Sequence, residues 1–190
     1  SIISVPPLTS QTFGLIQEEL ATDPFALLIA CVLLNKTHAS RGLPLFRSLI
    51  AHHPTPSSLA STSETSLALT LSALGLQNAR ARTLIALAQA WITNPPTRGR
   101  RYRTLDYPYR GAGRDIAPGE VLGDEEEDGR EGAWEVGHLP GLGPYAWDSW
   151  RMFCRDRLRG VGEGVEEEWK RVRPGDKELK AFVGWMGEKE

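Results

Sequence analysis

Apolar positions along most of the chain recur at helical spacing, and no segment shows the strict alternation of a half-buried strand. Asp23 followed by Pro24 predicts an N-cap and a first helical position, which open an apolar helix over residues 25–34. The clearest amphipathic pattern places one apolar stripe on a later helix, at Ala81, Leu84, Ile85, Ala88, Trp91 and Ile92. The pattern therefore predicts a helical chain.

Four more helices follow from capping residues and spacing. One is expected from Thr37 or Ser40 to His52, and a second from Ser63 until Gly75 closes it. The other two are expected over residues 145–158 and 177–186. With no strand predicted, the fold class is all-α.

Residues 94–133 interrupt this regularity. They are rich in Pro, Gly and charge, with basic residues gathered in 98–114 and an acidic run over 124–128. Such composition is typical of a mobile polar loop, and a long surface loop costs little extra closure entropy. We expect a flexible insertion in a single domain, and we expect deletion of residues 98–130 to be tolerated.

Composition narrows the class of protein. The chain has 190 residues, 41% of them hydrophobic, and a formal charge of −2, so no overall basic excess points to nucleic acid. No apolar run reaches the ~20 residues of a membrane helix, and the four His show no metal-ligand spacing. Because the sequence opens at Ser1 without a signal-peptide pattern, we expect a fragment of a soluble intracellular protein.

The sharpest candidate for chemistry is the segment Leu139–Tyr145, in which Gly141 and Gly143 flank one apolar residue between two expected helices. A glycine hairpin lets the backbone approach another molecule closely, and the amides that open the next helix favour an anion such as a DNA phosphate. Arg151, Arg155 and Arg159 on that helix could extend the contact. The alternative is a plain Gly-Pro turn beside a solvated Arg face.

Asp176 is the second candidate, because Pro174 and Gly175 place it at the start of the last expected helix. It can be a structural N-cap, which is the common use of Asp at such a position. It can also be a carboxylate at the floor of a cleft, where it stabilises positive charge on a sugar and orients an attacking water.

Together these segments resemble the helix–hairpin–helix DNA glycosylases. The similarity is greatest to the catalytic domain of the methyl-CpG-binding-domain mismatch glycosylases, which remove thymine or uracil opposite guanine. The matching blocks keep their order along the chain: Leu15–Glu18, Asp23–Phe25, Leu27–Ala30, Leu33–Thr37, Leu74–Leu76, Arg80–Ile85, Gly141–Tyr145, Asp148–Cys154 and Val172–Lys177. The resemblance implies two helical subdomains that flank a DNA-binding cleft.

The resemblance also implies roles for individual residues. Asp176 matches the catalytic aspartate, while Tyr145 and Gln17 match residues that line the pocket for an extruded base. Lys36 stands where relatives have a gap-filling Arg, and Lys lacks the planar fork of Arg. Leu76 matches the apolar wedge. Phosphate binding would fall to Gly141, Gly143 and Arg151, and no metal is implied.

Two features refine the expected reaction. Bifunctional members of the superfamily carry a hairpin Lys that attacks the sugar, whereas this chain has Tyr145 there. An iron–sulfur cluster needs four thiolates, and the chain has only Cys31 and Cys154, each expected to be a buried apolar residue. We therefore expect a monofunctional enzyme without a cofactor. Asp148, although near the hairpin, is assigned a structural or capping role.

The expected function is removal of thymine or uracil from G·T or G·U mismatches in double-stranded DNA, by base flipping and Asp-assisted hydrolysis. The expected enzyme is a nuclear monomer of base excision repair. Two alternatives stay open. One is a helix–hairpin–helix module that binds duplex DNA without catalysis, and the other is a glycosylase for another base, such as mismatched adenine or an alkylated base.

Overall fold

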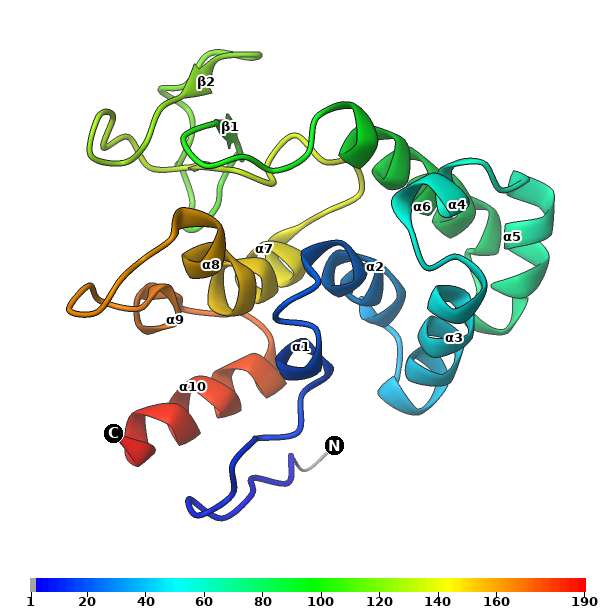
Figure 1. Cartoon of the computed structure of the whole chain (residues 1–190), viewed down its shortest axis with the longest axis horizontal. Helices are drawn as coiled ribbons and strands as arrows, with labels where there is room; N and C mark the ends of the chain where they lie inside the picture. The colour runs from blue at the N-terminus through cyan, green and yellow to red at the C-terminus, as the bar shows by residue number, and fades with distance from the viewer. Residues whose placement is uncertain (1–2) are drawn as a thin grey trace.

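The computed structural model describes residues 3–190, and helices build about half of the chain (Figure 1). The helices are α1 (Ile16–Glu19), α2 (Pro24–Leu34), α3 (Ala39–His52), α4 (Pro56–Ala60), α5 (Glu64–Thr70), α6 (Gln77–Thr93), α7 (Pro144–Trp150), α8 (Asp156–Arg159), α9 (Glu168–Arg171) and α10 (Lys177–Lys189). A 3₁₀ turn, η1 (Ser72–Leu74), precedes α6, and a π-helical segment, η2 (Arg151–Arg155), joins α7 to α8.

The predicted helix ends are confirmed where a cap specified them. Asp23 caps α2 by accepting the Ala26 amide at 3.0 Å, and Pro24 is the first helical residue. Ser63 caps α5 by accepting the Ser66 amide at 3.4 Å. These side chains satisfy amides that have no partner within the helix, which is why the boundaries could be predicted.

The helices form two lobes on either side of α2, as expected. In Figure 1, α3 to α6 gather on one side of α2 and α7 to α10 lie on the other. The main core is centred on α2 and α6, in which Leu27, Leu28, Leu84 and Leu87 are fully buried. A smaller cluster fixes α10, with Leu179 and Phe182 among its members.

The segment 94–133 departs from the expected irregular loop, because it contains a folded unit. Its strands β1 (Arg101–Arg103) and β2 (Val121–Leu122), together with β3 (Ala133–Trp134), form a small antiparallel sheet in the order β2-β1-β3. Tyr102 pairs with Val121 on one side and with Trp134 on the other. Backbone pairing of this kind was not predicted, since the strands are too short to show a period of two.

Buried polar side chains hold this unit together. Arg101 is only 2% exposed, and its Nε donates to the Gly123 carbonyl at 2.7 Å. Its other nitrogens donate to the carbonyls of Arg130 and Asp128. One guanidinium thus satisfies three loop carbonyls, beside a small apolar cluster of Ile116, Leu122 and Ala133. The composition had predicted a mobile polar loop here.

The helix expected over residues 145–158 forms as one continuous rod, α7–η2–α8, that ends at Gly160 in the left-handed conformation (φ +64°). Its π-helical middle was not predicted. A π segment shifts which side chains face inward. Arg151 and Arg155, both within η2, are consequently buried beneath Trp134.

Candidate active site

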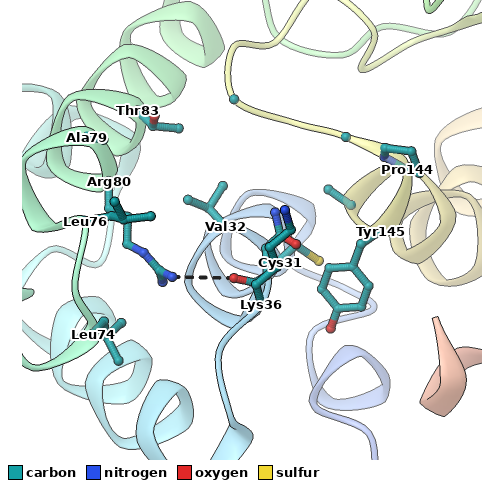
Figure 2. Close-up of a pocket in the computed structure, with 14 residues that line it drawn as sticks. Cys31, Val32, Lys36, Leu74, Leu76, Ala79, Arg80, Thr83, Pro144 and Tyr145 are labelled. Atoms are coloured by element: carbon teal, nitrogen blue, oxygen red, sulfur yellow. Dashed lines mark hydrogen bonds between the residues drawn. The ribbon is translucent and has the colours of Figure 1, made fainter. Parts of the chain in front are cut away.

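A cleft of about 450 Å³ opens between the end of α2, the start of α6 and the turn before α7. Figure 2 shows Leu76, Arg80 and Thr83 on one wall, with Pro144 and Tyr145 on the opposite wall and Cys31 between them. The cleft brings together most of the residues that the sequence singled out, namely Lys36, Leu76, Gly141, Gly143 and Tyr145.

Lys36 and Leu76 both have left-handed backbones at the edge of this cleft, with φ of +56° and +51°. Side chains other than Gly avoid this region at a cost of ~1–2 kcal/mol. Leu76 is also 76% exposed, so burial does not offset its strain. Strained residues that persist in a fold gather at ligand-binding sites. The conformation is therefore consistent with side chains held out to meet a partner.

Arg80 makes hydrogen bonds around both of these residues, and the sequence analysis did not name it as a site residue. Its Nη1 donates to the Leu33 carbonyl at 2.8 Å, and its Nη2 donates to Thr37 Oγ1 at 2.7 Å, on the two sides of Lys36. The Arg80 amide also donates to the Leu76 carbonyl at 2.9 Å. Burial lowers the pKa of this guanidinium from its usual value. Arg80 lies off the apolar stripe of α6, so the hydrophobic pattern gave no sign of these contacts.

The hairpin needs glycine at one of its two positions. Gly141 has φ +77°, and a Cβ there would lie 2.1 Å from Thr83 Cγ2 on α6. Gly141 therefore lets the turn pack against the facing wall. A Cβ at Gly143 would meet open space, and this residue is the N-cap of α7, ahead of Pro144.

A second cavity of about 250 Å³ adjoins the first and shares Tyr145 with it. Gln17, which is 3% exposed, donates from Nε2 to Tyr145 Oη at 2.9 Å and to Ser149 Oγ at 3.3 Å. Burial raises the pKa of Tyr145, so the phenol keeps its proton. The two predicted pocket residues are therefore in direct contact, although they lie far apart in sequence.

Asp176 is half-buried and caps α10, as the sequence predicted. Its Oδ1 accepts the amides of Glu178 at 2.8 Å and Leu179 at 3.1 Å. Within residues 3–190, no hydrogen bond reaches its Oδ2. Glu178, in the same first turn, lines the cavity that Tyr145 and Gln17 line. Asp176 itself lines neither cavity, but its charge acts on Tyr145, so the carboxylate lies within electrostatic reach of that phenol.

Arg151 is not placed for phosphate, which corrects the prediction. It is 5% exposed, its Nε donates to Glu168 Oε1 at 2.6 Å, and its guanidinium lies 3.8 Å from the ring centre of Trp134. Arg155 is 1% exposed and pairs with Glu135 at 3.1 Å. Both cations are neutralised inside the protein, because the π segment turns them inward and Trp134 covers them.

The cysteines are buried as expected. Burial raises the pKa of Cys31 and of Cys154 to about 12, so both thiols stay protonated and unreactive. Across residues 3–190, no group of three or more His, Cys, Asp or Glu side chains is arranged to hold a metal ion. The same residues include no helix that combines the length and apolarity of a membrane span.

Comparison with known proteins identifies the family. Residues 29–178 match the family model described as HhH-GPD superfamily base excision DNA repair protein. The chain belongs to the HhH-GPD superfamily. This match covers both walls of the cleft and reaches the first turn of α10.

Two relatives of the HhH-GPD chain are archaeal. It is 36% identical to the thymine-DNA glycosylase of Aeropyrum pernix over 67 residues. These residues make up 35% of this chain and 30% of the relative. It is 32% identical to the thymine/uracil-DNA glycosylase of Pyrobaculum aerophilum over 72 residues. These residues make up 38% of this chain and 31% of the relative. Each match thus spans less than a third of the relative's length.

Solved structures give a weaker likeness. A thermostable thymine-DNA glycosylase aligns with 88% of this chain and 74% of its own, at 18% identity and a TM-score of 0.49. A trapped endonuclease III–DNA covalent intermediate aligns with 90% of this chain and 72% of its own, at 19% identity and a TM-score of 0.45. Because both TM-scores are below 0.5, we take the family from the sequence match and not from these structures.

Proposed function

We propose that this HhH-GPD protein is a monofunctional DNA glycosylase that removes thymine or uracil from G·T or G·U mismatches in double-stranded DNA. One observation carries the proposal. A single cleft gathers an exposed apolar side chain, a cation, a glycine turn and Tyr145, whose phenol lies within electrostatic reach of Asp176. The names of the two archaeal relatives support the choice of base.

The cleft wall suits extrusion of a base from the duplex. Enzymes of this kind unstack the target nucleotide at a cost of a few kcal/mol, which is smallest at a mismatch. Leu76 and Lys36 would fill the vacated space, with Lys36 also able to contact phosphate. The amides of Gly141 and Gly143 would hold the backbone at the start of α7.

The pocket chemistry suits thymine and uracil. Both Nε2 protons of Gln17 are used by Tyr145 and Ser149, so Oε1 is left as an acceptor. The Tyr145 hydroxyl accepts from Gln17 and keeps its own proton to donate. Thymine and uracil offer an N3–H donor beside carbonyl acceptors, which matches this pair.

Asp176 would act on the sugar. Its Oδ1 is held by two helix amides, and Oδ2 is left to face the positive charge that develops as the N-glycosidic bond stretches. The bond breaks with its electron pair on the base, water adds to C1′, and the proton of the water passes to the carboxylate or to solvent. Tyr145, which occupies the place of a lyase Lys, provides no amine for strand cleavage.

The test uses labelled duplexes with G·T, G·U, mismatched adenine or an alkylated base, each followed by hot alkali. Product that appears with G·T or G·U, and only after alkali, supports the proposal. Strand breaks without alkali would show a lyase. Product only with the other bases would show a different specificity, and no product on any duplex would favour a non-catalytic DNA-binding module.

Asp176→Asn separates catalysis from capping, because Asn caps a helix about as well as Asp. We expect base release to be abolished, while affinity for duplex DNA and the unfolding midpoint are retained. Asp23→Asn is the matched control, since Asp23 also caps a helix, α2, by accepting a backbone amide. Turnover retained by Asp176→Asn would remove Asp176 from its proposed role.

The monomeric state and the nuclear location rest on the resemblance alone and stay predictions. Sedimentation would test the first, and localisation of a fluorescent fusion of the whole protein would test the second.

A further inference from the structure

Tyr107, from the segment 94–133, reaches into the interface with α7. The residue is 4% exposed, and its hydroxyl donates to Asp148 Oδ1 at 2.7 Å. Arg151 Nη1 donates to the same phenol oxygen at 3.3 Å. The ring also packs against Trp147, with ring centres 5.0 Å apart. The hydroxyl is thus held in one orientation, and that orientation serves Asp148.

Asp148 connects Tyr107 to the residue that precedes Asp176. It is 3% exposed and lies one helical turn after Tyr145. Its Oδ2 accepts the backbone amide of Gly175 at 3.4 Å, and Gly175 directly precedes Asp176. A buried carboxylate is costly unless hydrogen bonds satisfy it, so Asp148 fixes both of its donors. Hydrogen bonds therefore run without a break from Tyr107 to the residue that sets the direction of Asp176.

The electrostatics agree with this geometry. Burial raises the pKa of Asp148, whereas the hydrogen bonds from Tyr107 and Gly175 and the charge of Arg151 oppose that rise. The negative charge of Asp176 acts in the same direction as burial, which places the two carboxylates within electrostatic reach. Loss of the Tyr107 hydroxyl would remove the first of these opposing effects, so Asp148 would hold Gly175 less firmly.

We propose that Tyr107 and Asp148 are positioning residues for Asp176, which makes the segment 94–133 a supporting part of the active site. The inference rests on the catalytic role proposed for Asp176. Displacement of a catalytic group by about 1 Å can cost ~10²-fold in rate. The earlier expectation that residues 98–130 can be deleted is therefore reversed, since deletion removes Tyr107.

Tyr107→Phe removes only the hydroxyl, and Tyr102→Phe is the matched control. Tyr102 lies in β1 of the same segment, and its hydroxyl accepts from Asn94 Nδ2 at 2.7 Å, away from Asp148. On a G·T duplex, the single-turnover rate of Tyr107→Phe should fall ~10- to 100-fold, while its affinity for the duplex is unchanged. Tyr102→Phe should stay within about twofold of the parent in both, since it leaves the site untouched.

Asp148→Asn tests the second step. Its Oδ1 can still accept from Tyr107, but the amide nitrogen cannot accept from Gly175. We expect the same loss of rate at unchanged affinity. A loss of equal size in Tyr107→Phe and Tyr102→Phe would show general loosening of the segment and would overturn the proposal.

Hydrogen exchange gives a readout that does not need activity. The Gly175 amide should exchange faster in Tyr107→Phe and Asp148→Asn than in the parent and Tyr102→Phe, with the global free energy of unfolding matched by urea titration. If the parent releases no base, the proposed function fails, and faster exchange still supports the link. Unchanged exchange at Gly175 in both variants would refute it.

Discussion

The core centred on α2 and α6 and the unit around β1 and η2 are stabilised by opposite kinds of buried side chain. The first has an apolar interior, in which Leu27 and Leu84 are fully buried. The second buries charge, with Arg155 1% exposed and Glu168 fully buried. The comparison teaches that a polar, Gly- and Pro-rich stretch can be an ordered structural element when its charges find partners inside the protein.

Glu168→Gln should have the largest effect on stability. Glu168 Oε1 accepts from Arg151 at 2.6 Å, and its Oε2 lies 3.0 Å from Arg155 Nη1 as an ion pair without hydrogen-bond geometry. Removing this charge leaves two buried cations short of a partner, which costs about 3–5 kcal/mol. Urea unfolding would measure it. Glu19→Gln, at an exposed pair with Arg47, should cost less than about 1 kcal/mol, and equal losses would contradict the comparison.

Leu84→Ala tests the apolar side. It should lower the free energy of unfolding by about 2–5 kcal/mol, since the cavity it leaves cannot fully collapse. Leu69→Ala is the matched control, because Leu69 is 72% exposed and its truncation should change little. Equal results for the two variants would mean that the α2–α6 lobe is not packed as described.

Leu76→Gly should separate stability from function. Glycine adopts the left-handed backbone without the strain that Leu76 has there, although it loses more conformational entropy on folding. The net effect should be a rise of about 0.5–1 kcal/mol in the free energy of unfolding. Base release from a mismatched duplex should fall about tenfold or more, because no wedge opposes return of the base. Urea titration and single-turnover assays would measure the two effects. A variant that is less stable, or fully active, would argue against a strained wedge.

The raised pKa of Asp148 predicts that the stability of the protein depends on pH. Burial raises its pKa above the ordinary 3.8, so the native state keeps this proton to a higher pH than the unfolded chain does. This contribution to stability is complete below pH 3.8 and is lost as pH rises through the native pKa. The free energy of unfolding of the parent, minus that of Asp148→Asn, should therefore decrease from pH 3.5 upward. A difference that increases would show the opposite shift.

Residue type alone predicted much of the fold, whereas the cleft was predicted through the resemblance. The caps at Asp23 and Asp176 were predictable because a short acceptor before an apolar helix satisfies free amides locally. The contact of Gln17 with Tyr145 was predictable only through the resemblance, since 128 residues separate them. The prediction that Arg151 binds phosphate was wrong, because the sequence near a hairpin does not show whether an Arg side chain faces solvent or the interior.

The sequence by itself determined the helical elements, their caps and the glycine turn, because these depend on interactions within a few residues. Tertiary structure alone decided which charges are inside. It buried Arg101, Arg151 and Arg155 against carbonyls and carboxylates that lie 13 to 30 residues away. It also brought Tyr107 to Asp148, since a hydrogen bond between distant residues depends on the packing of whole elements and leaves no periodic trace in the chain.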